Sequence, residues 1–509
     1  MASSSSEPAA FNSQTDQGNA FARLLLVVTF LLIFLMAART PLDTDQWWHL
    51  RAGEETLRTG RPLMVDIFTI TRGGAAWTNA YWLADITMVW LFLRAGFLGL
   101  SAFVTALALG SMALVYLQSE GPPLLKSAAL LLGSVVASTV WSPRPQTVSL
   151  VLFALIAYLL YLYKWRARNY LWALPLIFML WGNVHGGFPM GFLLIAAVLG
   201  GEALNHVLAI PTPCPMPWNN MLRVGLWTLL SALAVMINPN GIDMWLLTTK
   251  TVGLEAVQNL IPEWASPDFH VLVQQSLVWL LLAVVAAVAL SGRVMDGSDL
   301  AIVLGFSLMA MISGRFFGPF ALVAVPVLTR YGATALERAR EHSPLIQRFA
   351  LHKSAPPDSP GTRRFKKVIN LLLVALLAFA AFSKLYIVTH PALVGHYLQQ
   401  GYPVDAVEWM EAQRPGARVF NEYNWGGYMQ WYARSARIFI DGRTDLFGDD
   451  LILAWMDALN ARPGWQDLLN QYDVDTIMLA PDRPLLEELP MQGWAQLYED
   501  EQVVIFGRK

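Results

Sequence analysis

Two carboxylates, a histidine and an arginine lie within one short stretch of this sequence: Asp43, Asp45, His49 and Arg51. A carboxylate can act as a general base toward a hydroxyl or amine when it has hydrogen-bond reach and a suitable pKa. Asp45 is the first candidate and Asp43 the second, because residues two apart on a helix do not share a face. Either could instead cap the helix expected over residues 46–58, because Asp is a preferred N-cap residue.

Two further arginines and a second histidine could contact a phosphate. Arg144 stands between two prolines, and Arg315 follows a glycine beside an apolar segment. Arginine binds phosphate through paired hydrogen bonds and keeps its charge when partly desolvated, although each could also be an anchor that reaches the membrane interface. His185 precedes a glycine pair that lets the backbone approach a ligand. It could position a leaving phosphate or an acceptor, or be an interfacial histidine without a ligand.

Hard oxygen ligands suited to Mg²⁺ or Mn²⁺ are present in Asp43, Asp45, Asp85 and Glu263. No spacing among them demands a metal, so a cation is an option that the sequence leaves open. The single cysteine, Cys214, excludes an intrachain disulfide and makes a cysteine-based metal site unfavourable. The chain contains no P-loop and no nucleophile elbow.

The elements that must position these residues are those of a membrane protein. Hydrophobic residues make up 55% of the 509-residue chain, the mean hydropathy is +0.43, and charged residues make up 14%, whereas soluble domains carry about 25%. The composition predicts an all-α polytopic membrane bundle. The net charge of −2 gives no reason to expect nucleic acid as a partner.

The chain contains about eleven apolar segments whose length approaches the ~20 residues needed to cross a bilayer. They cover residues 21–38, 97–118, 124–141, 147–163, 170–181, 191–209, 222–237, 271–290, 300–312, 319–329 and 368–387. Residues 82–93 are apolar but short, rich in Trp and interrupted by Asp85, so they are expected to lie along the membrane surface. With a cytoplasmic N-terminus, this assignment puts the basic segments 164–168 and 330–367 inside, as the positive-inside rule requires.

The loops on the opposite side then collect the polar residues that would be costly inside a membrane. These loops are residues 41–81, 142–146, 181–187, 238–270 and 313–316. We therefore expect Asp45, Arg144, His185 and Arg315 to open onto one pocket at the outer leaflet.

The ends of the chain differ from the bundle. Residues 1–20 are polar and are predicted to be a disordered cytoplasmic tail, and residues 330–367 a flexible cytoplasmic linker. Within the transmembrane domain, residues 21–388, the first extracytoplasmic loop covers residues 40–96 and carries two juxtamembrane helices. Residues 389–509 alternate short strands such as R-V-F-N and D-T-I-M-L with helices, which predicts a soluble α/β domain. An odd number of spans makes this domain extracytoplasmic.

Taken together, D-T-D-Q-W-W-H-L after the first span and a second juxtamembrane helix containing Asp85 resemble the C-type (GT-C) membrane glycosyltransferases. These include lipid A aminoarabinose transferases, protein O-mannosyltransferases and RgtA/B/C/D-like enzymes. The chain is more similar to a group of largely uncharacterised bacterial members with D-x-D-x-W-W-H-L, W-x-N-x-H-G-G, N-x-Y-x-W-G-G-Y and F-I-D-G-R. Here these motifs cover residues 43–50, 181–187, 421–428 and 439–443. The second acidic position is commonly Glu in GT-C enzymes and is Asp85 in this chain.

The resemblance implies a polyprenyl-phosphate-linked sugar donor, an extracytoplasmic glycan, lipid or protein acceptor, and usually inversion at the sugar. It implies a bacterial inner-membrane location. Asp45 and Asp43 are the expected catalytic residues. The expected substrate-binding residues are His49, Arg51, Asp85, Arg144, Asn183, His185, Glu263, Arg315 and Arg443.

In the soluble tail, Trp425, Tyr428, Asp441, Arg443 and Asp445 resemble a polar and aromatic surface that could hold an acceptor, and Arg443 could complete the site if the tail folds back over the bundle. The alternative is structural, with the glycine pair at a tight helix entry and Asp-Gly in a turn.

Two other function classes stay open. A non-catalytic scaffold with the same fold would have the same composition, because fold does not imply function. A transporter would carry ionisable residues inside its spans, but the spans of this chain contain few, of which Glu202, near one end of its span, is the clearest.

Overall fold

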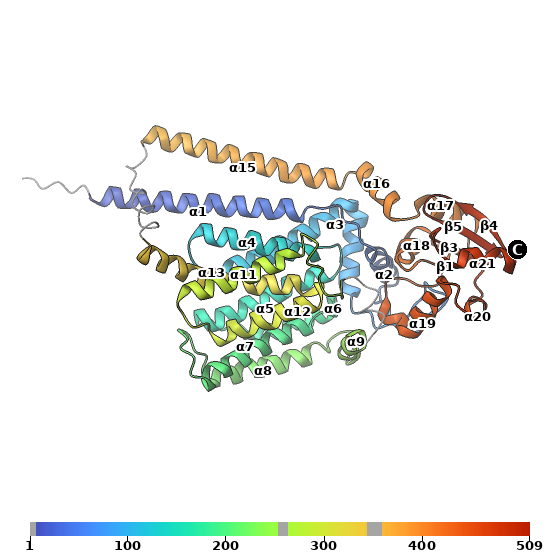
Figure 1. Cartoon of the computed structure of the whole chain (residues 1–509), viewed down its shortest axis with the longest axis horizontal. Coiled ribbons are helices and arrows are strands. Elements are labelled where there is room, and N and C mark those ends of the chain that lie inside the picture. Colours follow the sequence, from blue (N-terminus) through green and yellow to red (C-terminus); the bar gives the residue numbers. More distant parts are fainter. Residues whose placement is uncertain (1–6, 253–262, 344–358, 509) are drawn as a thin grey trace, which may run out of the picture.

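The computed structural model describes residues 7–252, 263–343 and 359–508. A bundle of long, roughly aligned helices carries an α/β domain at one end (Figure 1). Among the described residues, seven helices are long and apolar enough to cross a membrane, and three shorter apolar helices accompany them. The protein is therefore a multi-pass membrane protein.

Each predicted span falls on a helix. The bundle contains α1 (Glu7–Ala37), α3 (Trp82–Gln118), α4 (Pro123–Ala137), α5 (Gln146–Arg166), α6 (Leu174–Val184), α7 (Pro189–Val207), α8 (Trp218–Ala234), α11 (Gln275–Ser291), α12 (Gly297–Ile312), α13 (Phe317–His342) and α15 (Pro360–Val388). The core of the bundle is apolar and centred on α5 and α13, whose buried side chains include Phe153 and Phe320. Helix α15 lies outside this core beside α1 (Figure 1).

Helix α3 bends sharply at Gly96, where φ is 56° and ψ is −142°. A positive φ suits glycine because it has no Cβ. The bend separates the predicted surface helix from the predicted span that follows it. The first half of α3 packs on α2 (Gln46–Thr59) so closely that a Cβ on Gly53 would lie 2.2 Å from the carbonyl oxygen of Asp85.

Two predicted irregular regions are partly helical. Helix α1 begins at Glu7, so most of the expected disordered tail continues the first span; Pro8 lies in the first turn, where proline is tolerated. Helix α13 continues to His342 and α15 begins at Pro360, so both ends of the expected flexible linker are helical. Residues 344–358 of that linker lie outside the described residues.

The C-terminal domain is built on a five-stranded sheet of order β2-β1-β3-β5-β4. Its strands are β1 (Arg418–Asn421), β2 (Arg437–Ile438), β3 (Thr476–Leu479), β4 (Trp494–Glu499) and β5 (Val504–Arg508), of which β1 is parallel to β2 and β3, and β5 is antiparallel to β3 and β4. The helices are α16 (Pro391–Gly401), α17 (Val404–Gln413), α18 (Gly426–Tyr432), α19 (Thr444–Leu459), α20 (Trp465–Gln471) and α21 (Leu485–Glu488). The α/β pattern was predicted; strand β4 was not.

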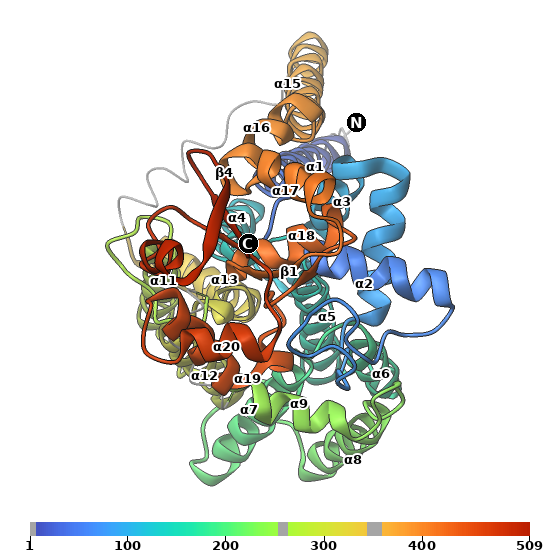
Figure 2. The same ribbon diagram turned by 90° about the vertical axis from the view of Figure 1, so that its right-hand side faces the viewer.

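The loop between α1 and α3 attaches this domain to the bundle. Thr69 bridges to Ile438 in β2, and the Ile70 N–H donates to the Ile438 carbonyl at 2.8 Å. The Arg443 guanidinium pairs with Asp66 of the loop at 2.7 Å. Figure 2 looks onto this end and shows the domain in front of the bundle, with α2 and α9 (Asp243–Val252) beside it.

Candidate functional site

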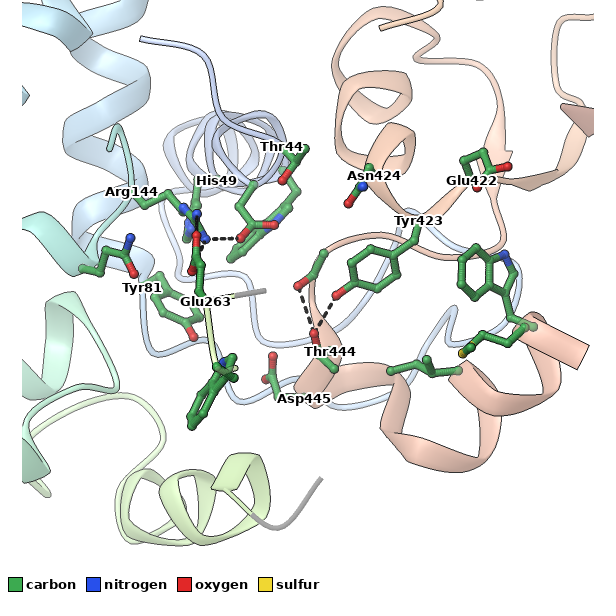
Figure 3. Close-up of a pocket in the computed structure, with 18 of the residues that line it drawn as sticks. Thr44, His49, Tyr81, Arg144, Glu263, Glu422, Tyr423, Asn424, Thr444 and Asp445 are labelled. Atoms are coloured by element: carbon green, nitrogen blue, oxygen red, sulfur yellow. Dashed lines mark hydrogen bonds and ion pairs between the residues drawn. The ribbon is translucent and has the colours of Figure 1, made fainter. Parts of the chain in front are cut away.

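A cavity of about 630 Å³ lies between the end of the bundle and the C-terminal domain (Figure 3). Sites for small molecules typically measure about 300–1,000 Å³. The bundle and its loops contribute Thr44, Asp45, Trp48, His49, Tyr81, Arg144, Pro145, Gln146, His185, Glu263, Trp264 and Arg315. The C-terminal domain contributes Glu422, Tyr423, Asn424, Gly442, Thr444, Asp445, Ile452, Trp455, Met456, Leu459, Asn460 and Arg483. The five loops that were predicted to face outward thus meet at one cavity.

Arg144 is the centre of the membrane-side wall. It precedes α5, and its Nε donates to Asp43 Oδ2 at 2.8 Å while Nη1 donates to Asp45 Oδ2 at 2.9 Å. The same guanidinium pairs with Glu263, including a contact of 3.3 Å from Nη1 to Oε2. Three carboxylates therefore surround one arginine, which fixes its orientation.

Arg315 lies in the short turn that begins α13. Its guanidinium stands over the Trp264 ring at 4.5 Å and its Nη2 lies 3.6 Å from Glu263 Oε2. The Glu263 carboxylate therefore bridges Arg144 and Arg315. An anion with three acceptor oxygens, such as a phosphate, has the charge and hydrogen-bonding capacity to take the place of this carboxylate.

Asp45 stands at the N-cap position of α2, but its side chain makes no capping bond. Its Oδ1 instead accepts the Trp48 indole N–H at 3.2 Å. Burial raises the pKa of Asp45 to about 6, against the lowering effect of Arg144. The carboxylate is thus ionised at neutral pH and close to the pKa at which a general base is most effective.

Asp43 does not line the cavity. Its Oδ1 accepts the backbone N–H of Asp45 at 3.0 Å, and its Oδ2 accepts from Arg144. Burial raises its pKa, while Arg144 lowers it. Of the two candidate bases, Asp45 alone belongs to the cavity wall, and Asp43 positions Arg144 and the start of α2.

His49 and Asp85 form a buried pair behind this wall. His49 Nδ1 lies 2.6 Å from Asp85 Oδ1, and Asn79 Nδ2 donates to Asp85 Oδ2 at 3.5 Å. His49 lines the cavity, whereas Asp85 does not. Burial lowers the pKa of His49, and Arg144 acts in the same direction. Asp85 therefore orients an uncharged His49 ring.

His185 is held in a defined tautomer. The Gly187 backbone N–H donates to His185 Nδ1 at 2.9 Å, so Nδ1 is an acceptor and the proton of the neutral ring is on Nε2. Ser149 Oγ lies 2.8 Å from the same nitrogen and accepts from Trp181 Nε1 at 2.7 Å. Burial lowers the pKa of His185 to about 3. His185 is therefore a neutral hydrogen-bond donor on the cavity wall.

The opposite wall belongs to the C-terminal domain. Tyr423 Oη and Thr444 Oγ1 lie 2.6 Å apart, and Arg483 donates to both oxygens of Glu422 at 2.6 and 2.9 Å. Asp445 lies between this wall and the bundle (Figure 3). Burial raises the pKa of Asp445 to about 6, so it is a second carboxylate that titrates in the cavity.

Arg51 and Asn183 were predicted to bind substrate, but they do not line the cavity. Arg51 pairs with Glu54 at 2.6 Å. Asn183 accepts the Trp82 indole N–H at 3.0 Å and donates to the Ile237 carbonyl at 2.8 Å. The Arg51 pair lies within α2, whereas Asn183 links α6 to α3 and to the segment after α8, and these bonds occupy both side chains away from the cavity.

Arg443 is also absent from the cavity wall, although the tail does fold over the bundle. Its side chain is 1% exposed and pairs with Asp441 at 2.6 Å and Asp66 at 2.7 Å. Tyr428 and Trp425 pack in the apolar cluster around Trp47. Of the polar and aromatic tail residues singled out in the sequence, Asp445 alone lines the cavity.

The glycines of the tail motifs allow close packing against the first loop. A Cβ on Gly442 would lie 2.0 Å from Asp45 Oδ1, and a Cβ on Gly427 would lie 3.0 Å from the Thr44 carbonyl oxygen. The W-G-G-Y and D-G-R motifs are thus explained by the contact between the two parts of the protein.

Several wall residues were missed in the sequence. Tyr423, Asn424 and Thr444 lie within or beside the quoted tail motifs, whose spacing was a usable signal. Trp455 and Arg483 stand in stretches without a motif, so only the fold brings them to the cavity.

Within residues 7–252, 263–343 and 359–508, no three His, Cys, Asp or Glu side chains are grouped so as to hold a metal ion. Asp43 and Asp45 both contact Arg144, whose charge occupies the place a cation would need. A role for Mg²⁺ or Mn²⁺ stays a prediction.

No protein-family model matches this chain, and no curated protein matches it. Solved structures do match. ArnT from Cupriavidus metallidurans in the apo state aligns with a TM-score of 0.53 at 12% identity, covering 96% of this chain and 98% of ArnT. The same protein bound to undecaprenyl phosphate aligns with a TM-score of 0.52 at 12% identity over the same shares of both chains. The chain therefore has the fold of ArnT, which is the GT-C-like fold that its motifs predicted.

Proposed function

We propose that this protein is a membrane glycosyltransferase that transfers a sugar from a polyprenyl-phosphate donor to an acceptor on the extracytoplasmic face. The observation that carries the proposal is the membrane-side wall of the cavity, where Arg144 and Arg315 share one carboxylate, Glu263, beside the half-buried Asp45. The similarity to ArnT, which has been solved with undecaprenyl phosphate, supports the same class of donor.

Donor binding follows from an exchange of anions. The phosphate takes the place of the Glu263 carboxylate between the two arginines, and both guanidinium groups then donate to its oxygens. Arg144 stays oriented during this exchange because Asp43 and Asp45 also hold it. The polyprenyl chain extends toward the bilayer along the bundle.

The transfer is a displacement at the anomeric carbon. An acceptor O–H or N–H attacks this carbon, the bond from the carbon to the phosphate oxygen breaks, and its electron pair leaves with the phosphate. Arg144 and Arg315 stabilise the phosphate charge that develops. The acceptor proton passes to Asp45, whose pKa of about 6 leaves it ionised at neutral pH. The neutral His185 supplies a hydrogen bond without adding charge.

The orientation of the protein in the membrane is part of the same proposal. Helix α5 follows Arg144 and ends at Arg166, so its 21 residues separate the cavity from Lys164 by about 30 Å. A cavity at the outer leaflet therefore puts the basic 164–168 segment in the cytoplasm, consistent with the positive-inside rule. The N-terminus is then cytoplasmic and the C-terminal domain extracytoplasmic, in the bacterial inner membrane.

Binding of undecaprenyl phosphate to the purified protein in nanodiscs tests the donor site. Hydrogen bonds to charged groups contribute about 1.5–3 kcal/mol, so Arg315→Ala should weaken binding about 10- to 100-fold. Glu263→Gln should strengthen it, because the competing anion is removed. Arg223→Ala, at an exposed arginine of α8, is the matched control and should leave binding unchanged. Absence of saturable binding, or binding indifferent to Arg315, would overturn the proposal.

A further inference from the structure

The C-terminal half of the cavity has a chemistry of its own. It combines aromatic and apolar side chains with amides and one paired guanidinium. These side chains are Tyr423, Ile452, Trp455, Met456, Leu459, Asn424, Asn460, Glu422 and Arg483. Sugar rings present apolar C–H faces and a rim of hydroxyl groups, so a wall of this kind can contact both.

Two side chains of this half are held in place by hydrogen bonds within the protein. Arg483 Nε and Nη2 donate to Glu422, which fixes the plane of the guanidinium. Trp455 Nε1 donates to the Asn421 carbonyl at 3.0 Å, which fixes the indole ring. Side chains that are already fixed lose less conformational entropy when a ligand binds.

The charge of this half selects against ionic ligands. Arg483 and Glu422 pair with each other beside the amides of Asn424 and Asn460, and Asp445, the remaining carboxylate that this domain contributes, lies toward the bundle (Figure 3). A phosphorylated ligand would meet Glu422, and a cationic ligand would meet Arg483. A neutral, hydroxyl-bearing molecule meets neither penalty.

The position of this half fits an acceptor. Figure 3 shows Arg144 and Glu263 on one side of the cavity, and Tyr423, Asn424 and Glu422 on the other. In an inverting displacement the nucleophile approaches the anomeric carbon from the face opposite the leaving phosphate. With the phosphate at the arginines, the acceptor enters from the side of the C-terminal domain.

We propose that the C-terminal domain supplies an acceptor subsite, lined by Asn424, Trp455 and Asn460, that binds a neutral saccharide. Its role as an acceptor subsite rests on the proposed function; its saccharide chemistry rests on the wall itself. The bundle then recognises the donor, the domain recognises the acceptor glycan, and the hydroxyl that attacks belongs to a sugar.

Saturation-transfer NMR on the full chain in nanodiscs tests this subsite, with maltotriose, cellotriose, triacetylchitotriose and mannotriose as neutral probes. The wild-type protein should transfer saturation to at least one of them. The double variant Asn424→Ala/Asn460→Ala should bind that probe about tenfold more weakly, because each amide contributes one or two hydrogen bonds. Both side chains are exposed, so the variant should fold. Gln492→Ala, an exposed amide in the same domain outside the cavity, is the matched control.

Undecaprenyl phosphate binding is measured in the same samples and separates the two proposals. Binding of the lipid without any trisaccharide signal, or a signal that the double variant leaves unchanged, overturns the acceptor subsite alone. A trisaccharide signal that depends on the two asparagines, without lipid binding, overturns the donor proposal and supports the saccharide site. The expected result is that the double variant loses the saccharide and keeps the lipid.

Discussion

Replacing Asp45 with Asn isolates the proton-accepting step. The substitution keeps the size of the side chain and leaves Arg144 with two carboxylate partners, Asp43 and Glu263. It removes the group that can accept the proton of the attacking hydroxyl. Since Asp45 makes no capping bond, the start of α2 should be unaffected.

The expected loss of activity follows from the proposed role of Asp45 as a general base. General base catalysis contributes about 10²- to 10⁴-fold, which corresponds to about 3–5 kcal/mol in the activation free energy. We therefore expect kcat to fall by about that factor. Affinity for undecaprenyl phosphate should stay similar or increase, because one carboxylate charge near the arginines has been removed.

The pH dependence gives a second readout. A base works when it is deprotonated, so wild-type activity should rise as the pH increases through about 6 and then level off. The Asp45→Asn variant should lose this rise. Because Asp445 has the same pKa of about 6, the Asp445→Asn variant is the matched control. It should keep the rise in activity near pH 6 that depends on Asp45.

The assay is the release of undecaprenyl phosphate from undecaprenyl-phosphate-linked sugars in proteoliposomes, followed by mass spectrometry with envelope glycan as acceptor. Transfer by the Asp45→Asn variant at more than about a tenth of the wild-type rate is incompatible with a general base at this position. An unchanged pH profile in that variant would refute the assignment independently.

Four further outcomes are expected. Gly442→Ala should reduce transfer, because its Cβ would meet Asp45 Oδ1 at 2.0 Å, whereas Gly395→Ala, where a Cβ meets nothing within 4 Å, should not. Lys164→Met should lower the melting temperature, because it leaves the fully buried Glu202 and Asp296 without their cation, at a cost of about 3–5 kcal/mol. Arg443→Met should destabilise by a similar amount, whereas Arg434→Met, which breaks an exposed pair with Glu54, should cost less than about 1 kcal/mol. Chelation by EDTA should leave undecaprenyl phosphate binding unchanged if the two arginines alone meet its charge, and a loss of binding would show that a divalent cation takes part.

The sequence predicted the bundle because membrane helices are encoded locally, in the length and polarity of each apolar segment. The break between the surface helix and the next span was also local, since the Trp-rich segment with Asp85 ends just before Gly96. The meeting of Arg144, His185 and Arg315 at one cavity followed from the charge asymmetry of the loops, which orders them on two sides of the membrane.

Pairings between distant segments could not be predicted from the sequence. Arg443 has the same chemistry as Arg144, yet it is buried between Asp66 and Asp441, while Arg144 reaches the cavity. Nothing in the residue type or its neighbours separates these two outcomes. Arg483 was not predicted to belong to the site, yet it lines the cavity. Its position there depends on its pair with Glu422, which lies far away in the chain.

The attachment of the first loop to the C-terminal sheet also has a consequence during protein synthesis. Thr71 Oγ1 donates to the Phe439 carbonyl across a separation of 368 residues, and that sheet is completed by β5, which ends at Arg508. At a translation rate of about 5–20 residues per second, the loop waits roughly 20 to 70 s for its partner. Ribosome-bound chains therefore carry an unfinished cavity, and its C-terminal wall is complete only after β5 has been synthesised and has paired with β3.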